Sequence, residues 1–229
     1  LDSEGYDLLG LMTGSEGLLG VITEVIVKIL KKPEAVKAAL IGFSSIEDAG
    51  QCVSEIIAKG IIPAGMEIMD KALTKATNDY SKAGYPIDAE AMMIIELDGT
   101  ETEVSELIKR VEDIAKKNKC SSIKINKSEE ERLKFWAGRK AAFPACGDLA
   151  PDYMCMDGSI PRGKLAEVLK EIQRLSKKYE LPVANAFHAG DGNLHPLIMF
   201  NANDPEQLRK TEELGSEILK YCVKVGGAL

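Results

Sequence analysis

The sequence has 229 residues, of which 45% are hydrophobic and 28% are charged, the proportions of an ordinary globular protein with room for one large domain or two small ones. Its formal net charge of −7 argues against nucleic-acid binding, because phosphate recognition needs a concentrated basic face. No apolar run has the length of a membrane span and no signal peptide opens the chain, whose first residues, with no Met, read as the middle of a longer protein.

The cysteines are odd in number and contain no CxxC pair. This pattern is typical of reduced thiols in a cytoplasmic protein and not of a disulfide framework or a zinc knuckle. We expect most of them to be small core residues. The five are Cys52, Cys120, Cys146, Cys155 and Cys222.

Single strands alternate with single helices through the first part of the chain. Thr100 with Glu103 predicts a capping box, and Ser45 predicts a helix N-cap. The apolar spacing then sets the type of each segment. Strands are expected at 21–30, 36–43, 61–68, 91–97 and 121–125, and helices after Ser45, from Asp70 to Tyr80, after Thr100 and over 128–142.

A second round of the same alternation follows. A strand is expected at 153–157, a helix from Pro161, two strands at 182–188 and 194–200, and a helix from Asp204 and Pro205. This order predicts an α+β fold of ferredoxin-like split βαβ units, with an antiparallel sheet and helices packed on one side. Neither GxGxxG nor a P-loop occurs in the chain.

Both histidines of the chain lie in one short segment around Asp191 and Gly192. Asp-Gly favours a two-residue type I′ hairpin turn, which would place His188 directly opposite His195. Opposed residues have Cβ atoms roughly 4.5–5.5 Å apart and can share a divalent ion. The competing interpretation is two unrelated histidines at strand ends. Asp191 has a helper role at most, and a third ligand, expected to be a carboxylate, has no obvious candidate.

Three segments carry a resemblance that runs along the whole chain. They are the glycine-rich stretch 14–24, the pair of stretches 135–144 and 151–162, and the histidine segment 188–198. Together they resemble the FAD-linked oxidases related to vanillyl-alcohol oxidase, in the branch of the glycolate oxidase D subunits and D-lactate dehydrogenases. The resemblance implies that residues 1–31 are the C-terminal edge of an FAD-binding domain and that 32–229 form a substrate domain truncated at its end.

The resemblance also implies a site. Arg139 would bind the substrate carboxylate through its planar guanidinium, although its spacing alone is that of a solvated helix residue. His188 and His195 would bind a divalent metal, zinc or a similar ion, beside the substrate hydroxyl. The glycine-rich stretch would lie against FAD, although by itself it reads as a plain turn. Its expected cofactor-binding residues are Gly14, Ser15, Glu16, Gly17, Gly20, Val21 and Ile22.

The implied function is oxidation of a small 2-hydroxy acid, glycolate or D-lactate, with electrons passed to an acceptor protein or quinone. Other oxidase subunits and a cytoplasmic location, peripheral to the inner membrane through those subunits, are implied as well. Family members continue into a Gly-Glu-His-Gly segment that supplies the third metal ligand and the catalytic base. This chain ends at Leu229, so we expect no catalytic residue within it and a colourless, inactive chain.

Two alternatives remain open at this stage. Relatives that oxidise the dicarboxylate 2-hydroxyglutarate carry Asn two residues after the second histidine, where this chain has Leu197. The apolar residue favours a monocarboxylate without excluding a dicarboxylate dehydrogenase. The other alternative is a metal-binding or assembly module with no catalysis of its own.

Overall fold

The computed structural model describes residues 4–229, which fall into two compact units that divide between Lys32 and Pro33. The first unit contains the short helix α1 (Leu8–Met12). The strand expected at 21–30 is wrong: these residues form neither helix nor strand. Their β-branched residues favour an extended backbone, but a strand also needs a neighbour to share its hydrogen bonds. Residues 21–30 pair with no described residue.

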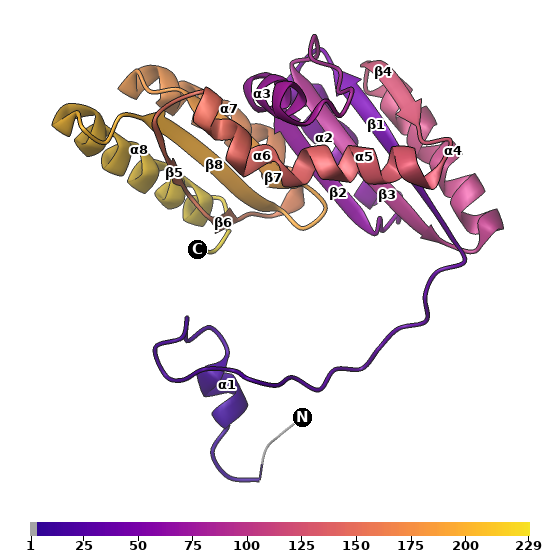
Figure 1. The fold of residues 1–229 in the computed structure, drawn as a ribbon, viewed down its shortest axis with the longest axis horizontal. Helices are drawn as coiled ribbons and strands as arrows, with labels where there is room; N and C mark the ends of the chain where they lie inside the picture. Colours follow the sequence, from indigo (N-terminus) through magenta and orange to yellow (C-terminus); the bar gives the residue numbers. More distant parts are fainter. Residues whose placement is uncertain (1–3) are drawn as a thin grey trace. The chain divides into compact units, whose positions relative to one another are not determined.

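The second unit is built on one eight-stranded sheet in the order β4-β1-β3-β2-β7-β8-β5, with β6 also paired to β8 (Figure 1). All the strand pairs are antiparallel. The strands are β1 (Ala35–Phe43), β2 (Gly65–Asp70), β3 (Ala91–Gly99), β4 (Cys120–Ile125), β5 (Asp152–Cys155), β6 (Gly158–Ser159), β7 (Val183–His188) and β8 (Asn193–Phe200).

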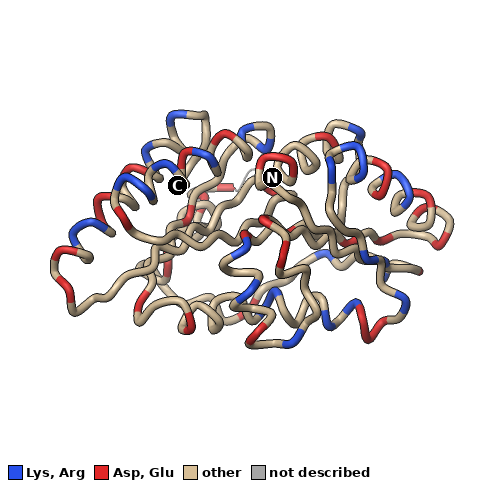
Figure 2. The backbone as a smooth tube through the Cα atoms, turned by 90° about the horizontal axis from the view of Figure 1, so that it is seen from above, with Lys and Arg blue, Asp and Glu red and all other residues tan. Residues whose placement is uncertain are grey.

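The helices cover both faces of this sheet (Figure 2). One layer of four long helices lies on one face, and a second layer of three helices lies on the other face. The first layer is α2 (Ile46–Ala58), α4 (Glu101–Lys117), α7 (Leu165–Tyr179) and α8 (Pro205–Lys224); the second is α3 (Lys71–Ser81), α5 (Glu129–Lys140) and α6 (Ala142–Ala145). Short 3₁₀ turns at Cys146–Asp148 and Arg162–Lys164 precede β5 and α7.

The expected ferredoxin-like order is confirmed. In the first half, β1-α2-β2 encloses β3 and β3-α4-β4 encloses β1, which is the split βαβ arrangement. In the second half, β5-α7-β7 encloses β8 in the same way. The layer of helices expected on one side is present, and α3, α5 and α6 add a second layer to it.

Two apolar cores follow from the alternation of side chains along the strands. On β1, Ile41 points into the core under α2, α4 and α7, whereas Leu40 points into the core under α3 and α5. Met93 and Met92 divide in the same way on β3. A sheet buried on both faces needs apolar residues at consecutive positions. This explains the nearly unbroken apolar runs of these two strands.

The capping signals were reliable guides to the helix starts. The capping box of α4 is confirmed, since Thr100 Oγ1 accepts from the Glu103 backbone at 3.3 Å and Glu103 Oε2 accepts from the Thr100 backbone at 3.0 Å. Ser45 caps α2 as expected. Two boundaries differ by more than two residues: β2 begins at Gly65, four residues later than expected, and α7 begins at Leu165 after a 3₁₀ turn.

The cysteines are all free thiols, and three of the five are buried, which confirms that most of them are small core residues. Burial raises the pKa of Cys52 to about 12 and that of Cys146 to about 11. Thiols with such values are almost entirely protonated at neutral pH and are therefore poor nucleophiles.

Asp70 makes the stability of the second unit depend on pH. Burial raises the pKa of this carboxyl to about 6, although Oδ1 accepts from the Leu73 backbone at 3.0 Å and Oδ2 accepts from Asn185 at 2.8 Å. An unfolded Asp titrates near 3.9, so the folded state retains the proton more strongly. The contribution to the free energy of unfolding is therefore complete below about pH 4 and is lost as pH rises toward 6.

We expect Asp70→Asn to remove this dependence, because the amide can still cap α3 but does not ionise. Because Asp70 is partly exposed, the wild-type free energy of unfolding should fall by ~1–2 kcal/mol relative to the variant between about pH 4 and 6.5. Urea unfolding across that pH range measures the free energy of unfolding of both proteins. The contributions of the other carboxylates cancel when the two values are subtracted. Parallel curves for the two proteins would contradict the assignment to Asp70.

Candidate functional site

The hairpin between β7 and β8 brings the two histidines together, but not in the expected register. A two-residue turn is wrong, because His188 pairs with Asn193 and a four-residue loop, 189–192, joins the strands. The backbone N–H groups of Asp191 and Gly192 both donate to the His188 carbonyl at 3.0 Å, and Gly190 donates to Met66 on β2 at 3.1 Å. Those bonds remove the loop residues from the β7–β8 ladder.

Gly192 is the residue that this loop requires. Its φ is +79°, and a Cβ there would lie 2.2 Å from the Ile160 carbonyl oxygen, so only glycine fits. The Asp-Gly pair therefore indicated that a hairpin joins the two strands, although the expected two-residue turn is wrong. It did not indicate the loop length, because Gly190 is held by the neighbouring strand β2.

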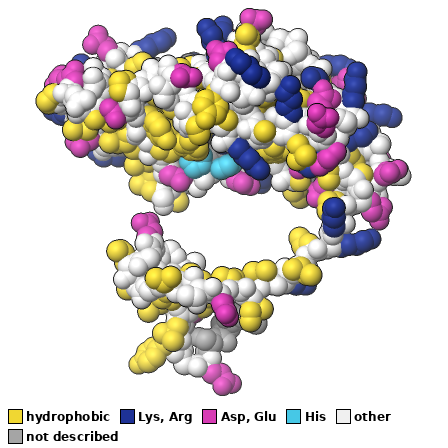
Figure 3. All heavy atoms as spheres, in the orientation of Figure 1, with side chains coloured by type: hydrophobic (Ala, Val, Ile, Leu, Met, Phe, Trp, Pro, Cys, Tyr) yellow, Lys and Arg dark blue, Asp and Glu magenta, His cyan; other side chains and the backbone are white. Residues whose placement is uncertain are grey.

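The register difference leaves the two imidazoles on one face. His195 pairs with Ala186, two positions from His188 along β7, and residues two apart point to the same side of a sheet. The histidines are thus diagonal neighbours, with ring centroids 5.1 Å apart and ring planes at 90°. Figure 3 shows the histidine side chains adjacent at the surface, with apolar, acidic and basic side chains around them.

Glu67 on β2 completes the cluster, and the sequence reading missed it. It pairs with His188 in the β2–β7 register, and its Oε1 lies 2.7 Å from His188 Nδ1. Only 8% of Glu67 is exposed. A buried carboxylate needs partners, so a lone Glu inside the apolar strand 65–70 was the signal that could have identified it.

Arg139 on α5 binds the other oxygen of the same carboxylate. Its Nε donates to Glu67 Oε2 at 3.1 Å, and the residue is buried. The solvated-helix interpretation of Arg139 is therefore wrong. Helix α5 is held over this face of the sheet by Phe135, which is fully buried in the core that contains Leu197 and Ala186.

His195 lies deeper than His188, with 14% of its side chain exposed against 41%. Burial lowers the pKa of His195, and Asp157, whose Oδ2 is 3.9 Å from Nδ1, raises it by a smaller amount. The imidazole is therefore neutral at neutral pH, the form that binds metals. Phe143 packs edge-on against this ring, with centroids 6.4 Å apart.

The donor set fits a divalent metal in part. Two imidazoles share a face, as a zinc site needs. Within residues 4–229, however, no group of three His, Cys, Asp or Glu side chains is placed to hold one ion. Asp191 is exposed in the loop and joins no such group.

The residues expected to contact FAD all lie in the first unit. Ser15 is half-buried, and the others, namely Gly14, Glu16, Gly17, Gly20, Val21 and Ile22, are exposed. No side chain of residues 4–32 is fully buried. This unit exposes a series of large apolar side chains that includes Leu18, Val25, Ile26 and Ile29.

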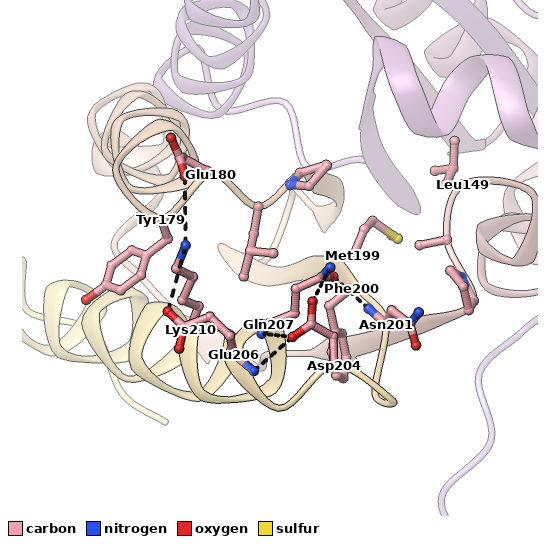
Figure 4. A pocket seen from close by; sticks show the side chains of 14 residues that line it. Leu149, Tyr179, Glu180, Met199, Phe200, Asn201, Asp204, Glu206, Gln207 and Lys210 are labelled. Carbon is pink, nitrogen blue, oxygen red and sulfur yellow. Dashed lines mark hydrogen bonds and ion pairs between the residues drawn. The ribbon is translucent and has the colours of Figure 1, made fainter.

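A pocket of about 590 Å³ lies elsewhere, where β8 leads into α8 (Figure 4). Lys210 projects between Glu180 and Glu206, at 3.8 and 4.0 Å from their carboxylate oxygens. None of its lining residues belongs to the histidine cluster. Among the described residues, no helix combines the length and the apolar character needed to cross a membrane.

Comparison with known sequences gives consistent matches. The family model described as FAD linked oxidases, C-terminal domain, matches residues 32–229. The glycolate oxidase subunit GlcD of Escherichia coli (strain K12) is 55% identical over 229 residues, which is 100% of this chain and 46% of that protein. The mitochondrial D-lactate dehydrogenase (cytochrome) of Arabidopsis thaliana is 31% identical, over 97% of this chain and 39% of that protein. The chain thus spans less than half the length of these curated relatives.

Solved structures share the fold. Alkyldihydroxyacetonephosphate synthase superposes with a TM-score of 0.68 at 20% identity, over 100% of this chain and 46% of its own. p-Cresol methylhydroxylase with substrate bound superposes with a TM-score of 0.64 at 17% identity, over 86% and 45%. At these identities the likeness shows a common architecture and nothing about substrate.

Proposed function

This chain belongs to the family of C-terminal domains of FAD linked oxidases, and we propose that it forms the substrate-binding half of an enzyme that oxidises a small 2-hydroxy acid, glycolate or D-lactate, to the 2-oxo acid. The observation that carries the proposal is the cluster of Arg139, His188 and His195 around Glu67. Arg139 can bind a carboxylate, and the two histidines beside it can bind a cation. These are the two binding groups that the carboxylate and the hydroxyl of a 2-hydroxy acid require.

The first unit supports an FAD-binding partner. Residues 4–32 expose many large apolar side chains, and exposed apolar surface of this kind often marks an interface with another protein surface. We propose that 1–31 are the C-terminal edge of the FAD-binding domain and that 32–229 are the substrate domain. FAD, when bound, supplies the hydride acceptor. Residues 1–3 of this proposed edge lie outside the described residues.

The chain's own residues bind and orient the substrate. The guanidinium of Arg139 donates through Nε to Glu67, which leaves its terminal nitrogens for a substrate carboxylate. His188 and His195 would hold a divalent ion, zinc being the natural candidate for two imidazoles. Such an ion, when bound, lowers the pKa of a coordinated hydroxyl. A third ligand and the general base would come from outside these 229 residues.

Leu197 supports a monocarboxylate over a dicarboxylate. It is fully buried and follows His195 by two residues, so it lies on the same face of β8. An apolar side chain at that place offers no hydrogen bond to a second carboxylate, and a buried charge without a partner is costly.

The test of the function is direct. Full-length enzyme mixed anaerobically with glycolate, D-lactate or 2-hydroxyglutarate should show bleaching of the flavin absorbance with one of the first two acids. Bleaching with 2-hydroxyglutarate alone would favour the dicarboxylate enzyme. A full-length protein without flavin, or one reduced by none of the acids, would favour a non-catalytic module.

We expect Arg139→Lys in the full-length enzyme to lower kcat/KM roughly 10- to 150-fold. This factor corresponds to a loss of ~1.5–3 kcal/mol of transition-state stabilisation. Lysine keeps the charge near Glu67 but cannot donate from a planar fork. Steady-state kinetics measure the loss, and Lys140→Arg, an exposed change at the next position, is the control. Equal kcat/KM in the wild-type and Arg139→Lys enzymes would remove Arg139 from the substrate site.

The partners follow from the same family membership. The two electrons removed from the substrate need a final acceptor, for which we propose an acceptor protein or quinone, and we propose further oxidase subunits because the Escherichia coli relative is itself named a subunit. We place the enzyme in the cytoplasm, peripheral to the inner membrane through those subunits. Cell fractionation tests this location, by measuring how the full-length protein divides between the membrane and soluble fractions and which subunits purify with it.

A further inference from the structure

A single buried carboxylate joins the two halves of the proposed site. Glu67 Oε1 lies 2.7 Å from His188 Nδ1, and Glu67 Oε2 lies 3.1 Å from Arg139 Nε. These are charge-assisted contacts, which are stronger and more directional than neutral ones. The carboxylate comes from β2, whereas its partners come from β7 and α5.

The contact with His188 selects one form of the imidazole. A carboxylate is an acceptor, so Nδ1 must carry the hydrogen and donate it to Oε1. A neutral imidazole with its hydrogen on Nδ1 has a free lone pair on Nε2, at the far side of the ring from Glu67. That lone pair is available to a metal ion, as in other carboxylate–histidine–metal arrangements.

The contact with Arg139 selects one orientation of the guanidinium. With Nε engaged by Oε2, the edge that carries the two terminal nitrogens faces away from Glu67. The two terminal nitrogens on this edge can form paired hydrogen bonds with a second carboxylate. Both ligand-binding groups are therefore oriented by one side chain that is itself nearly inaccessible to solvent.

We propose that Glu67 is a positioning residue that sets the His188 tautomer for metal binding and orients Arg139 for the substrate carboxylate. This inference rests on the proposed function for its two ligands. Both carboxylate oxygens of Glu67 already contact the protein groups that it orients, so we place Glu67 behind those groups and not in contact with either ligand.

Glu96 provides a matched control. It lies on the adjacent strand β3, its side chain is 16% exposed, and its Oε2 accepts from Arg132 at 2.7 Å and from Trp136 at 2.5 Å. It is thus another largely buried carboxylate with two donors, one of them an arginine from α5, but it has no contact with a histidine. A purely structural ion pair at Glu67 should behave as Glu96 does.

The experiment compares Glu67→Ala and Glu67→Gln with Glu96→Gln in the full-length protein. We expect Glu67→Ala to weaken Zn²⁺ binding by ~10–100-fold in chelator-buffered titrations, the range for removal of a carboxylate behind a ligating histidine, and to raise KM more than it lowers kcat. The single amide oxygen in Glu67→Gln can accept a hydrogen bond from His188 or from Arg139 but not from both. We therefore expect smaller changes in Zn²⁺ affinity and KM than in Glu67→Ala. Glu96→Gln should change melting temperature alone.

A second readout does not depend on metal, substrate or flavin. In metal-stripped protein at alkaline pH, ¹⁵N spectra assigned with His188→Ala should show the His188 hydrogen on Nδ1 in the wild type and on Nε2 in Glu67→Ala. A wild-type hydrogen on Nε2 would overturn the proposal even if the enzyme oxidises glycolate. So would Glu67 variants that lose only thermal stability. Loss of zinc as complete as in His188→Ala would make Glu67 a ligand and would also overturn it.

Discussion

His188→Ala in the full-length enzyme is expected to lose its bound divalent metal and its turnover together. A ligated cation contributes several kcal/mol of charge stabilisation, so kcat should fall by ~10³-fold, equivalent to about 4 kcal/mol. Because 41% of the His188 side chain is exposed and Glu67 keeps its bond to Arg139, the stability cost should be no more than about 1 kcal/mol. Metal analysis, steady-state kinetics and urea unfolding measure the three quantities.

Asp191→Ala is the control for His188→Ala. Asp191 is exposed in the same hairpin loop and should affect neither metal content nor turnover. Full turnover by wild-type enzyme after exhaustive chelation would show that the histidines have no metal role. Loss of folding in His188→Ala would instead show that the pair is structural.

Phe187→Ala should have the opposite effect, a large loss of stability. Phe187 precedes His188 on β7 and points to the other face, where it is fully buried in the core under α2 and α7. Truncation of a buried Phe removes its transfer free energy and leaves a cavity, at a cost of ~3–5 kcal/mol. This is a large part of the ~5–15 kcal/mol that stabilises a typical domain.

The midpoint of urea unfolding, monitored by far-UV circular dichroism, measures the Phe187→Ala effect. Phe187→Leu fills most of the same space and should cost less than half as much, by the same cavity argument. A difference below about 1 kcal/mol for Phe187→Ala would mean that the core under α7 collapses around the change. Metal binding by the folded fraction should persist, since the His188 side chain is on the other face.

Local signals determined most elements of the second unit. The capping box at Thr100 and the N-cap at Ser45 depend on residues three positions apart, so they can be read from the chain directly. The alternation of strands and helices also predicted the split βαβ order, because short connections leave few topologies. The second layer of helices was not predicted, although the nearly unbroken apolar runs of β1 and β3 are the signal of strands buried on both faces.

The histidine pair shows what a short-range pattern can and cannot determine. Parity along β7 and β8 placed both imidazoles on one face, and a shift of two residues in register preserves parity. The register itself depends on the bond from Gly190 to Met66, two residues that are far apart in the sequence. The prediction of a strand at 21–30 was wrong for a related reason. The strand propensity of these residues is a local property, whereas the neighbouring strand that they would need is set by the tertiary structure.

The sequence by itself therefore determined the family, the order of the elements and the two histidines and arginine of the candidate site. Only the tertiary structure identified Glu67, because its role depends on three elements, β2, β7 and α5, that meet in space. A carboxylate in an apolar strand indicates that a buried polar partner exists, but it does not indicate which residue that partner is. Its partners are 72 and 121 residues away in the chain. Sequence spacing predicts contacts only between residues a few positions apart, so it could not identify them.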